Sequence, residues 1–456
     1  MLEQTVFCKT ILSGDCWLDN VVISIDGSGF ITQIESGIAA DADEKIDGIV
    51  IPGMPNVHSH SFQRLIAGDS GPMGKQGDSF WSWREAMYSA ANRVSPAHYE
   101  AVAAWVFTEM LKAGYTSCAE FHYVHHQANG RAYDNRAEMS HRLLAAAGDS
   151  GLALTLLPVL YCRAGFGEAG VNDAQRQFFH SPEAYLNLLE LIQKQINNNS
   201  TTRLGIAFHS LRAVSGESAE MVLSSPLLKE VPIHIHIAEQ PAEVQASIEH
   251  LGARPVEWLL DNFSVDENWC LVHATHLSDQ ELAAASACRA LAGLCPTTEA
   301  DLGDGMFRTD DWLQAGGRIG IGSDSNVRIS VTDELRQLEY NERLKTGRRN
   351  VLTSPELTCG RYLYQHCAKD GASAVGQSVG RLEKGYRFDV VELDDSHELL
   401  LGKTPDAVMD TWVFAGDSGM IRSVWVSGIA QVVEGRHKDE HRLRHNFMLV
   451  MREFYE

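Results

Sequence analysis

Two histidines, His58 and His60, stand two positions apart at the end of an apolar run that begins at Ile49. On a β-strand, residues two apart point to the same face, so both imidazoles would enter the same space. Such a pair can serve as ligands of a transition metal. Because the same spacing also occurs on ordinary surface strands, a metal role requires further ligands from elsewhere in the chain.

Two further apolar segments end in groups that can bind a metal or transfer a proton. Residues 232–239 read Pro-Ile-His-Ile-His-Ile-Ala-Glu, and residues 320–324 read Gly-Ile-Gly-Ser-Asp. Three imidazoles and one carboxylate suit a single Zn²⁺ with one position left for water, although Fe²⁺ or Mn²⁺ also accepts such ligands. The predicted metal ligands are His58, His60, His236 and Asp324.

The middle of the chain, residues 51–379, alternates short apolar strands with longer helical segments, which is typical of β/α units. One such helix is predicted over residues 97–113, closed by Gly114. Eight units predict a (β/α)8 TIM-type barrel. The predicted strands cover residues 49–57, 116–123, 152–161, 204–211, 233–238, 270–274, 292–295 and 318–323.

The two ends of the chain show a different sequence pattern from the middle. Residues 1–50 and 380–435 contain short alternating strands around turn signals, and we expect them to fold together into a small composite β-sandwich. Residues 436–456 are expected to form a C-terminal helical tail. The resulting fold class is α/β, a barrel with one accessory β unit.

Composition excludes several classes of partner. The chain has 38 basic and 60 acidic residues, and its net charge of −22 argues against nucleic acid and against anionic membrane surfaces. No apolar stretch is long enough to span a membrane, and the N-terminus lacks the features of a secretory signal. Nine cysteines without CxxC spacing predict reduced thiols in a cytoplasmic protein.

Reactive groups in such barrels gather where the carboxyl ends of the strands meet the following loops. His236 lies nearer that end than His234, so we expect His234 to be a hydrogen-bonded core residue. We expect His125 and His126 to be solvated loop residues, with supporting roles for Glu120 and His122. The predicted strands end in His58 and His60, Glu120 and His122, His209 and Arg212, His236 and Glu239, His273 and His276, residues 297–299, and Asp324.

The end of the fourth predicted strand bears on the number of metal ions. Two-metal barrels of this kind usually carry a bridging lysine or glutamate there. Residues 204–210 read Leu-Gly-Ile-Ala-Phe-His-Ser and contain no lysine. We therefore expect one ion per subunit.

These motifs resemble those of the amidohydrolase superfamily, and His236 followed by Glu239 is similar to the arrangement in its mononuclear deaminase branch. His273 after the sixth strand and Asp324 after the eighth complete the pattern. The resemblance runs over nearly the whole chain. It rests further on residues 52–64, on residues 78–85, which include Phe-Trp-Ser-Trp-Arg, on residues 234–240, and on residues 322–325 followed by 334–336.

The resemblance implies hydrolysis of the terminal C=NH bond of a linear amidine, N-formimino-L-glutamate, to N-formyl-L-glutamate and ammonia in histidine degradation. It implies that Gln63 lies near the formimino group. It also implies a homodimer. The residues that would hold the two carboxylates are Arg84, Tyr123, His209 and Arg212.

Residue chemistry agrees with this substrate class. A chain at −22 cannot steer an anion by its overall field, so local cations such as Arg84 and Arg212 must bind the carboxylates. Arg84 follows an aromatic segment, predicted as a loop, that fits a lid or a subunit contact.

The predicted catalytic residues are Glu239, His273 and Asp324. Asp324 can accept a proton from water, Glu239 can pass one to the departing nitrogen, and His273 can polarise the reacting group or hold hydroxide in line. The residues alone leave open which group takes the first proton.

Two other functions remain open from the sequence. The first is a mononuclear deaminase or dechlorinase that acts on a heterocycle such as guanine or an adenosine derivative, with stacking aromatics in place of paired arginines. The second is a barrel that serves only as a binding or scaffold module.

Overall fold

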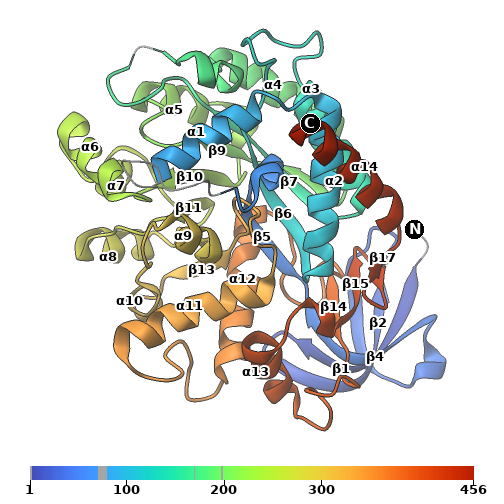
Figure 1. Ribbon diagram of the computed structural model, residues 1–456. Helices are drawn as coiled ribbons and strands as arrows, with labels where there is room; N and C mark the ends of the chain where they lie inside the picture. Colours follow the sequence, from blue (N-terminus) through green and yellow to red (C-terminus); the bar gives the residue numbers. More distant parts are fainter. Residues whose placement is uncertain (1–2, 70–79, 169, 197–198) are drawn as a thin grey trace.

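The computed structural model describes residues 3–69, 80–168, 170–196 and 199–456 (Figure 1). Within these residues the chain forms two β-sheets. A parallel sheet curves into a barrel at the centre of Figure 1, and a mixed sheet lies at its lower right. This confirms the predicted α/β fold, a (β/α)8 barrel with an accessory unit built from both ends of the chain.

All strand pairs in the central sheet are parallel, and the order along its main path is β13-β12-β11-β10-β9-β7-β6-β5, with β8 paired to β7. An isolated bridge between Ser59 and Asp324 joins the two ends of the path and closes the barrel. The strands are β5 (Met54–Ser59), β6 (Tyr115–His122), β7 (Ala153–Leu160), β8 (Thr202–Leu204), β9 (Ile206–Phe208), β10 (Ile233–Ile237), β11 (Trp269–His273), β12 (Leu291–Leu294) and β13 (Arg318–Ile321).

The first predicted barrel strand, residues 49–57, is in fact two strands in different sheets. Strand β4 (Glu44–Pro52) belongs to the mixed sheet, and β5 starts the barrel at Met54. Gly53 stands between them, where an added Cβ would lie 2.2 Å from the Thr116 side chain. The apolar pattern is continuous through this point because both strands are buried, so it could not show that the chain changes sheet.

Helices surround the barrel and connect its strands. Helix α2 (Pro96–Lys112) matches the prediction for residues 97–113: Ser95 caps its start by accepting from the His98 N–H at 3.2 Å, and Gly114 follows with φ +96°. The others are α1 (Phe80–Ala91), α3 (Glu138–Ser150), α4 (Pro182–Ile196), α5 (Gly216–Leu223), α6 (Pro241–Leu251), α7 (Pro255–Asn262), α8 (Asp279–Ala287), α9 (Pro296–Leu302), α10 (Thr309–Gln314), α11 (Val331–Thr346), α12 (Cys359–Val375), α13 (Pro405–Ala415) and α14 (Glu440–Tyr455). Short 3₁₀ turns are η1 (Ala39–Asp41), η2 (Ser61–Ile66), η3 (Asp173–Phe178), η4 (Pro226–Leu228) and η5 (Ser418–Met420).

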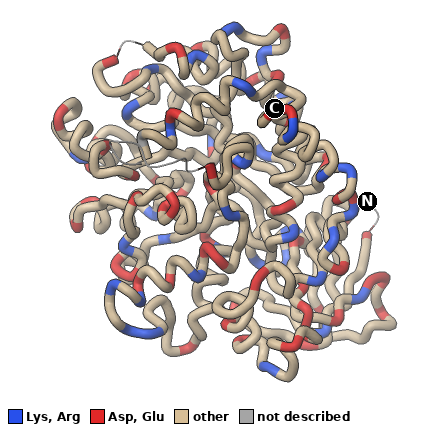
Figure 2. Tube along the Cα trace, viewed as in Figure 1, with Lys and Arg blue, Asp and Glu red and all other residues tan. Residues whose placement is uncertain are grey.

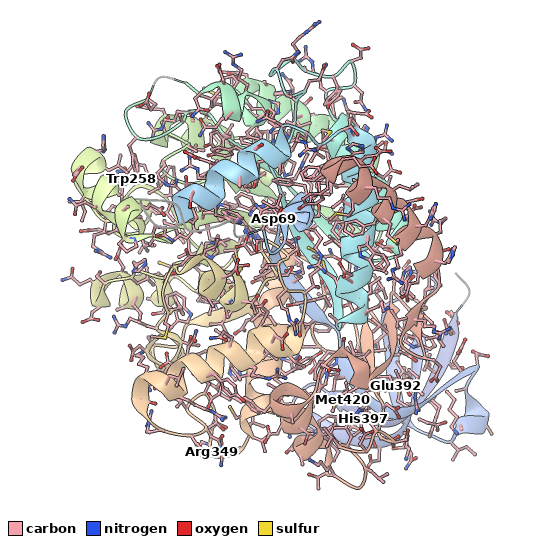
Figure 3. All side chains as sticks on the ribbon, in the orientation of Figure 1. Asp69, Trp258, Arg349, Glu392, His397 and Met420 are labelled. Atoms are coloured by element: carbon pink, nitrogen blue, oxygen red, sulfur yellow. The ribbon has the colours of Figure 1, made fainter. Side chains whose placement is uncertain are left out.

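The mixed sheet takes strands from both ends of the chain in the order β17-β16-β15-β14-β4-β1-β2-β3. Figure 3 shows Glu392, His397 and Met420 gathered on this side of the molecule, with Trp258 of α7 at the opposite edge. The domain boundaries predicted above stay a prediction. The remaining strands are β1 (Gln4–Ser13), β2 (Cys16–Ile25), β3 (Ile31–Ser36), β14 (Val390–Leu393), β15 (Ile421–Val426), β16 (Ile429–Val433) and β17 (Arg436–His437).

The C-terminal helix α14 packs along α2, as Figure 1 shows at the right of the molecule. Lys112 of α2 binds Glu440 of α14 through an ion pair of 2.8 Å. Acidic and basic residues alternate along the whole trace in Figure 2, so the negative excess is spread over the molecule. Across the described ranges, no helix combines the length and the apolar character needed to cross a membrane.

A buried ion pair joins the barrel to the mixed sheet. Arg387, 1% exposed, donates to both carboxylate oxygens of Asp389 at 2.8 and 2.6 Å. It also donates to Gln377 and to the Ser200 carbonyl, while Asp389 accepts from the Ser427 N–H at 2.8 Å. These bonds connect segments that are nearly two hundred residues apart in sequence.

Replacing Arg387 by methionine should destabilise the protein strongly. The variant would leave the Asp389 carboxylate buried without its cation, and loss of one partner of a buried pair costs about 3–5 kcal/mol. Denaturant unfolding measures the change. The matched control is Arg328→Met, since Arg328 pairs with Asp333 on the surface, where such a pair contributes at most about 1 kcal/mol. Equal effects of the two variants would contradict the structural role of Arg387.

Candidate metal centre and active site

Three imidazoles from two strands meet at the mouth of the barrel. The Nε2 atom of His58 lies 3.1 Å from Nε2 of His60 and 3.0 Å from Nε2 of His236. His58 and His60 come from the end of β5, and His236 comes from β10 on the other side of the barrel. The structure therefore brings together the three histidines that were predicted as ligands.

Hydrogen bonds on the far side of these rings fix which nitrogen carries the hydrogen. His60 Nδ1 lies 2.9 Å from the Phe121 carbonyl, and His236 Nδ1 lies 3.0 Å from the His209 carbonyl. A carbonyl only accepts, so both Nδ1 atoms donate and both Nε2 atoms present lone pairs. Burial lowers the pKa of all three histidines, that of His58 to about 3, so the rings are neutral.

Asp324 supplies the fourth ligand atom. Its Oδ1 lies 3.3 Å from Nε2 of both His58 and His60. Ligand atoms held about 2.0–2.1 Å from a tetrahedral zinc ion stand roughly 3.3 Å from one another. Lone pairs that face each other at this spacing repel unless a cation lies between them, so the four donor atoms fit one Zn²⁺-sized ion. His58 also belongs to a second group of possible ligands, with His236 and His273.

The closing bridge of the barrel holds Asp324 in place. Its N–H donates to the His58 carbonyl at 3.0 Å, and the His60 N–H donates to the Asp324 carbonyl at 2.9 Å. Asn326 Nδ2 also donates to that carbonyl at 3.0 Å and to Ser59 Oγ at 3.1 Å. Asn326 thus supports the backbone on both sides of the candidate ligands.

Beside the metal ligands lies a buried cluster of acid and base groups. His273 Nε2 is 3.7 Å from Glu239 Oε1 and 3.9 Å from Asp324 Oδ2, and its Nδ1 is 3.2 Å from Glu299 Oε1. Burial raises the pKa of Glu239 to about 7. Burial alone would lower the pKa of His273, but the carboxylates of Glu239, Glu299 and Asp324 raise it well above its usual value. The cluster can therefore bind and release a proton near neutral pH.

Desolvation and neighbouring charge act in opposite directions on Asp324. Burial alone would raise its pKa, but its contacts with His58 and His60 and the positive charge of the protonated His273 hold that pKa well below its usual value. Cys295 lies next to His273 and Asp324, but burial raises the pKa of its thiol well above the usual range. A neutral thiol is a poor metal ligand, so the described groups favour Asp324 over Cys295.

A single cavity is lined by three of the four candidate metal ligands, all but the fully buried His58, and by all five residues predicted to bind substrate. Gln63 Nε2 donates to Tyr123 Oη at 2.8 Å, which leaves Gln63 Oε1 buried and without a partner among the described residues. Burial, followed by the charges of Arg212 and Arg84, lowers the pKa of His209 and keeps it neutral. The cavity is lined by His60, Gln63, Phe80, Trp83, Arg84, Met87, Tyr88, Tyr123, His209, Arg212, His236, Glu239, His273, Leu302 and Asp324.

Two expectations about individual residues need correction. His125 is not solvated: it is 2% exposed, and its Nε2 donates to the Val159 carbonyl at 3.0 Å. His126 is half-buried, with a similar bond of 2.9 Å to the Phe179 carbonyl. The aromatic segment before Arg84 is not a loop but the start of α1, apart from residues 78–79, which lie outside the described residues.

Other expectations hold. His234 is a buried core residue whose Nε2 donates to the Ala374 carbonyl at 2.9 Å. Glu120 has a supporting role beside the ligand strand, because its Oε1 accepts from the N–H and the hydroxyl of Ser61 at 2.7 and 2.6 Å. His122 Nδ1 lies 3.1 Å from Tyr99 Oη, away from the metal ligands.

Sequence reasoning missed two tyrosines near the arginines, Tyr88 and Tyr161. Tyr161 directly follows β7, so the rule that reactive groups sit at strand ends would have found it. Tyr88 lies four residues after Arg84 on α1, a spacing that places both on one helix face. That signal was lost because the segment was expected to be a loop.

The roles of the two histidines on β10 can be separated by a matched pair of substitutions. His236→Asn removes a ligand, and because loss of a mere supporting contact already weakens metal binding roughly 10–100-fold, this change should weaken it further. His234→Asn should leave the metal content unchanged. Metal analysis after dialysis measures both. Equal metal content in the two variants would contradict the assignment of His236.

Comparisons with known proteins agree with this geometry. The profile of the Amidohydrolase family matches residues 49–430. The chain is 45% identical over 454 residues to a formimidoylglutamate deiminase from Pseudomonas aeruginosa, covering 99% of this chain and 100% of that relative. The crystal structure of an amidohydrolase from Brucella melitensis superposes with a TM-score of 0.93 at 44% identity, over 99% of this chain and 100% of the other.

A more distant structural neighbour shows how far the fold extends. An adenosine deaminase from Xanthomonas campestris, solved with bound zinc, superposes with a TM-score of 0.81 over 100% of this chain and 99% of the other. Its identity is 18%, so this likeness concerns the fold alone. From the family profile and the full-length relative, we conclude that the chain belongs to the amidohydrolase family.

Proposed function

We propose that this chain is a zinc-dependent hydrolase that converts N-formimino-L-glutamate and water to N-formyl-L-glutamate and ammonia. The observation that carries the proposal is that one cavity is lined by the candidate ligands His60, His236 and Asp324, by the acid–base residues Glu239 and His273, and by two arginines, Arg84 and Arg212. The full-length relative named formimidoylglutamate deiminase supports the same reaction.

The cavity suits a substrate with two carboxylates and one amidine. Arg84 and Arg212 can each bind a carboxylate through a guanidinium fork. Tyr123 and the neutral His209 line the same space and can add hydrogen bonds. The unpartnered Gln63 Oε1 can accept from an N–H of the amidine, which carries donors and no negative charge. Each polar wall of the cavity thus has a matching group on the proposed substrate.

The reaction requires a nucleophile and a route for protons. When bound to the three histidines and Asp324, Zn²⁺ lowers the pKa of a water molecule toward neutrality and polarises the amidine. Asp324 can accept a proton at its second oxygen, Oδ2, which faces His273 at 3.9 Å. Glu239, whose pKa is raised by burial, can donate a proton to the departing nitrogen, and Asp324 can pass on the proton taken from water. Glu239 can then take back the remaining hydroxyl proton as the nitrogen leaves as ammonia.

His273 has an electrostatic task in this scheme. Its Nδ1 is fixed by Glu299, so Nε2 points at Glu239 and Asp324. In the protonated form that these carboxylates favour, it can stabilise negative charge on the oxygen that adds to the amidine carbon.

The wider setting of the enzyme is also part of the proposal. We infer one Zn²⁺ per subunit, a place in histidine degradation, a homodimer, and a cytoplasmic location without nucleic-acid or membrane partners. All nine cysteines are free, which fits a reducing compartment. The zinc bound by the distant adenosine deaminase and the spacing of the four donor atoms here support zinc over iron or manganese.

The reaction is tested by ammonia release from the zinc-loaded protein. N-formimino-L-glutamate should be turned over, whereas adenosine and guanine should give no more than background, because two arginines have no counterpart on a purine ring. Ammonia released only from the purines would replace the proposal by the heterocycle deaminase considered above. Release from none of them would leave a binding module.

The role of Glu239 is tested by Glu239→Gln. Glutamine keeps the size of the side chain but cannot donate and accept the proton, so we expect turnover to fall by roughly two or more decades while the metal content stays unchanged. Glu249→Gln, an exposed glutamate on α6, is the matched control and should retain full activity. Turnover close to that of the control would refute the assignment.

A further inference from the structure

A fully buried glutamine stands behind the arginine side of the cavity. Gln175 of η3 is 1% exposed, and its Oε1 accepts from the Asn172 N–H at 3.2 Å. Its Nε2 donates to Tyr88 Oη at 3.1 Å and to Tyr161 Oη at 2.9 Å. The amide has two N–H groups, and both are used. Its orientation is therefore settled by its partners, with the donors facing the two tyrosines.

Both acceptor positions on the Tyr88 oxygen are consequently occupied. It accepts from Gln175 and also from Arg84 Nε at 2.5 Å, and a phenol oxygen has two acceptor positions. The hydroxyl hydrogen of Tyr88 must then donate to a third group. The geometry makes Tyr88 a directed donor, although a free tyrosine could either donate or accept.

Tyr161 is not the group that accepts the hydrogen bond from the Tyr88 hydroxyl. Its oxygen accepts from Gln175 and is also bonded to Arg84, so it too has both positions filled. The two hydroxyls are also in contact, but with both acceptor positions of Tyr161 occupied the Tyr88 hydrogen is left to donate elsewhere. Burial raises the pKa of Tyr161, so it keeps its hydrogen. Of the two, Tyr88 is the one that lines the cavity.

Tyr88 and Arg84 lie at the end of the cavity away from the metal ligands. Both also line a second, outer groove, whose other walls are Glu85, Ser89, Asn92, Asn172, Asp173 and Ala174. Both arginines act electrostatically on His209, but Arg212 also acts on Glu239, the acid beside the ligands. Arg84 and Tyr88 thus form the wall between the reaction site and the outer groove.

The chemistry of the proposed substrate decides which carboxylate reaches this wall. The formimino carbon is attached to the α-carbon through the nitrogen that stays in the product, so with the formimino group at the metal the α-carboxylate would lie near Arg212. The side-chain carboxylate extends two methylene groups further, toward Arg84 and Tyr88.

We infer that Tyr88 is a specificity-determining residue that donates a hydrogen bond to the side-chain carboxylate of the substrate, next to Arg84, with Gln175 as the residue that positions it. This inference rests on the proposed function and adds to it a means of substrate selection. An acceptor must occupy the third position at Tyr88, so a substrate with a methyl or another apolar group there leaves a buried donor unpaired. The site therefore selects amidines that carry a second carboxylate.

The test compares two substrates on Tyr88→Phe. For N-formimino-L-glutamate we expect KM to rise roughly 10–100-fold, the loss typical of a hydrogen bond to a charged group, with kcat within about threefold. For N-formimino-L-norvaline, which has a methyl group in place of the side-chain carboxylate, kcat/KM of the variant should equal or exceed that of the wild type, because the variant leaves no buried donor unpaired. The substrate preference, measured as the ratio of the two kcat/KM values, should thus fall by at least the same factor.

Tyr340→Phe is the matched control for this substitution. Tyr340 lies on α11, is 36% exposed and packs on Phe414, away from the cavity. Removing its hydroxyl should therefore leave kcat/KM unchanged for both substrates. A Tyr88→Phe variant that weakens both substrates equally would show a merely structural role and overturn the inference. A variant that matches Tyr340→Phe on both substrates would overturn it as well.

A pair of substitutions at Gln175 tests the same point if Tyr88→Phe fails to fold. Gln175→Glu places an acceptor where the donors were, so the tyrosine hydroxyls turn toward it and away from the substrate. Gln175→Met removes the donors without adding an acceptor. The rise in KM for N-formimino-L-glutamate should be several-fold larger for Gln175→Glu, and equal effects on KM would overturn the inference. Wild-type protein that releases no ammonia from this substrate would overturn the proposed function and with it the inference, whereas an active wild type with a neutral Tyr88→Phe would overturn the inference alone.

Discussion

Three imidazole lone pairs and a carboxylate face each other at the mouth of this barrel, and only a cation makes that arrangement favourable. The ring hydrogens of His60 and His236 are committed to backbone carbonyls, so these rings cannot turn their donors inward. Those carbonyls belong to Phe121, at the end of β6, and to His209, at the end of β9. Strand β6 lies next to β5, which leads to His60, and β9 lies next to β10, which carries His236. The ligands are therefore oriented by the barrel itself, and the position of every other group in the cavity is set relative to them.

Backbone strain is concentrated at the same strand ends. His273 and Asp324 have φ of 66° and 43°, and Ala238 and Ala274 have φ of 52° and 48°. Each such residue without glycine's freedom costs about 1–3 kcal/mol. Hydrogen bonds between strands hold this geometry, among them those from the Asp324 N–H to the His58 carbonyl and from the Ala274 N–H to the Ile237 carbonyl. The strained turns point the His273 and Asp324 side chains into the cavity, where a regular strand would carry them past it.

The sequence was sufficient to predict that these side chains meet at the barrel mouth, because parallel strands bring their carboxyl ends to one edge, whatever their distance along the chain. His58, His236 and Asp324 could thus be grouped before any contact was known. The change of sheet at Gly53 could not be predicted, since burial on both sides gives one unbroken apolar run. The burial of His125 depends on the Val159 carbonyl, a partner from another strand that no local pattern reveals. Tyr88 was missed because aromatic residues, which are weak helix formers, concealed the start of α1.

The mixed sheet makes the order of synthesis matter for folding. Strand β4 pairs with β1 on one side and with β14 on the other, and β14 lies some 340 residues later in the chain. While the barrel is being translated, the far edge of β4 exposes unpaired backbone groups next to the buried Val50 and Ile51. Open strand edges of this kind pair readily with other chains. This edge of β4 stays open until β14 has been synthesised, so shortened chains that end before β14 should aggregate more readily than the full chain.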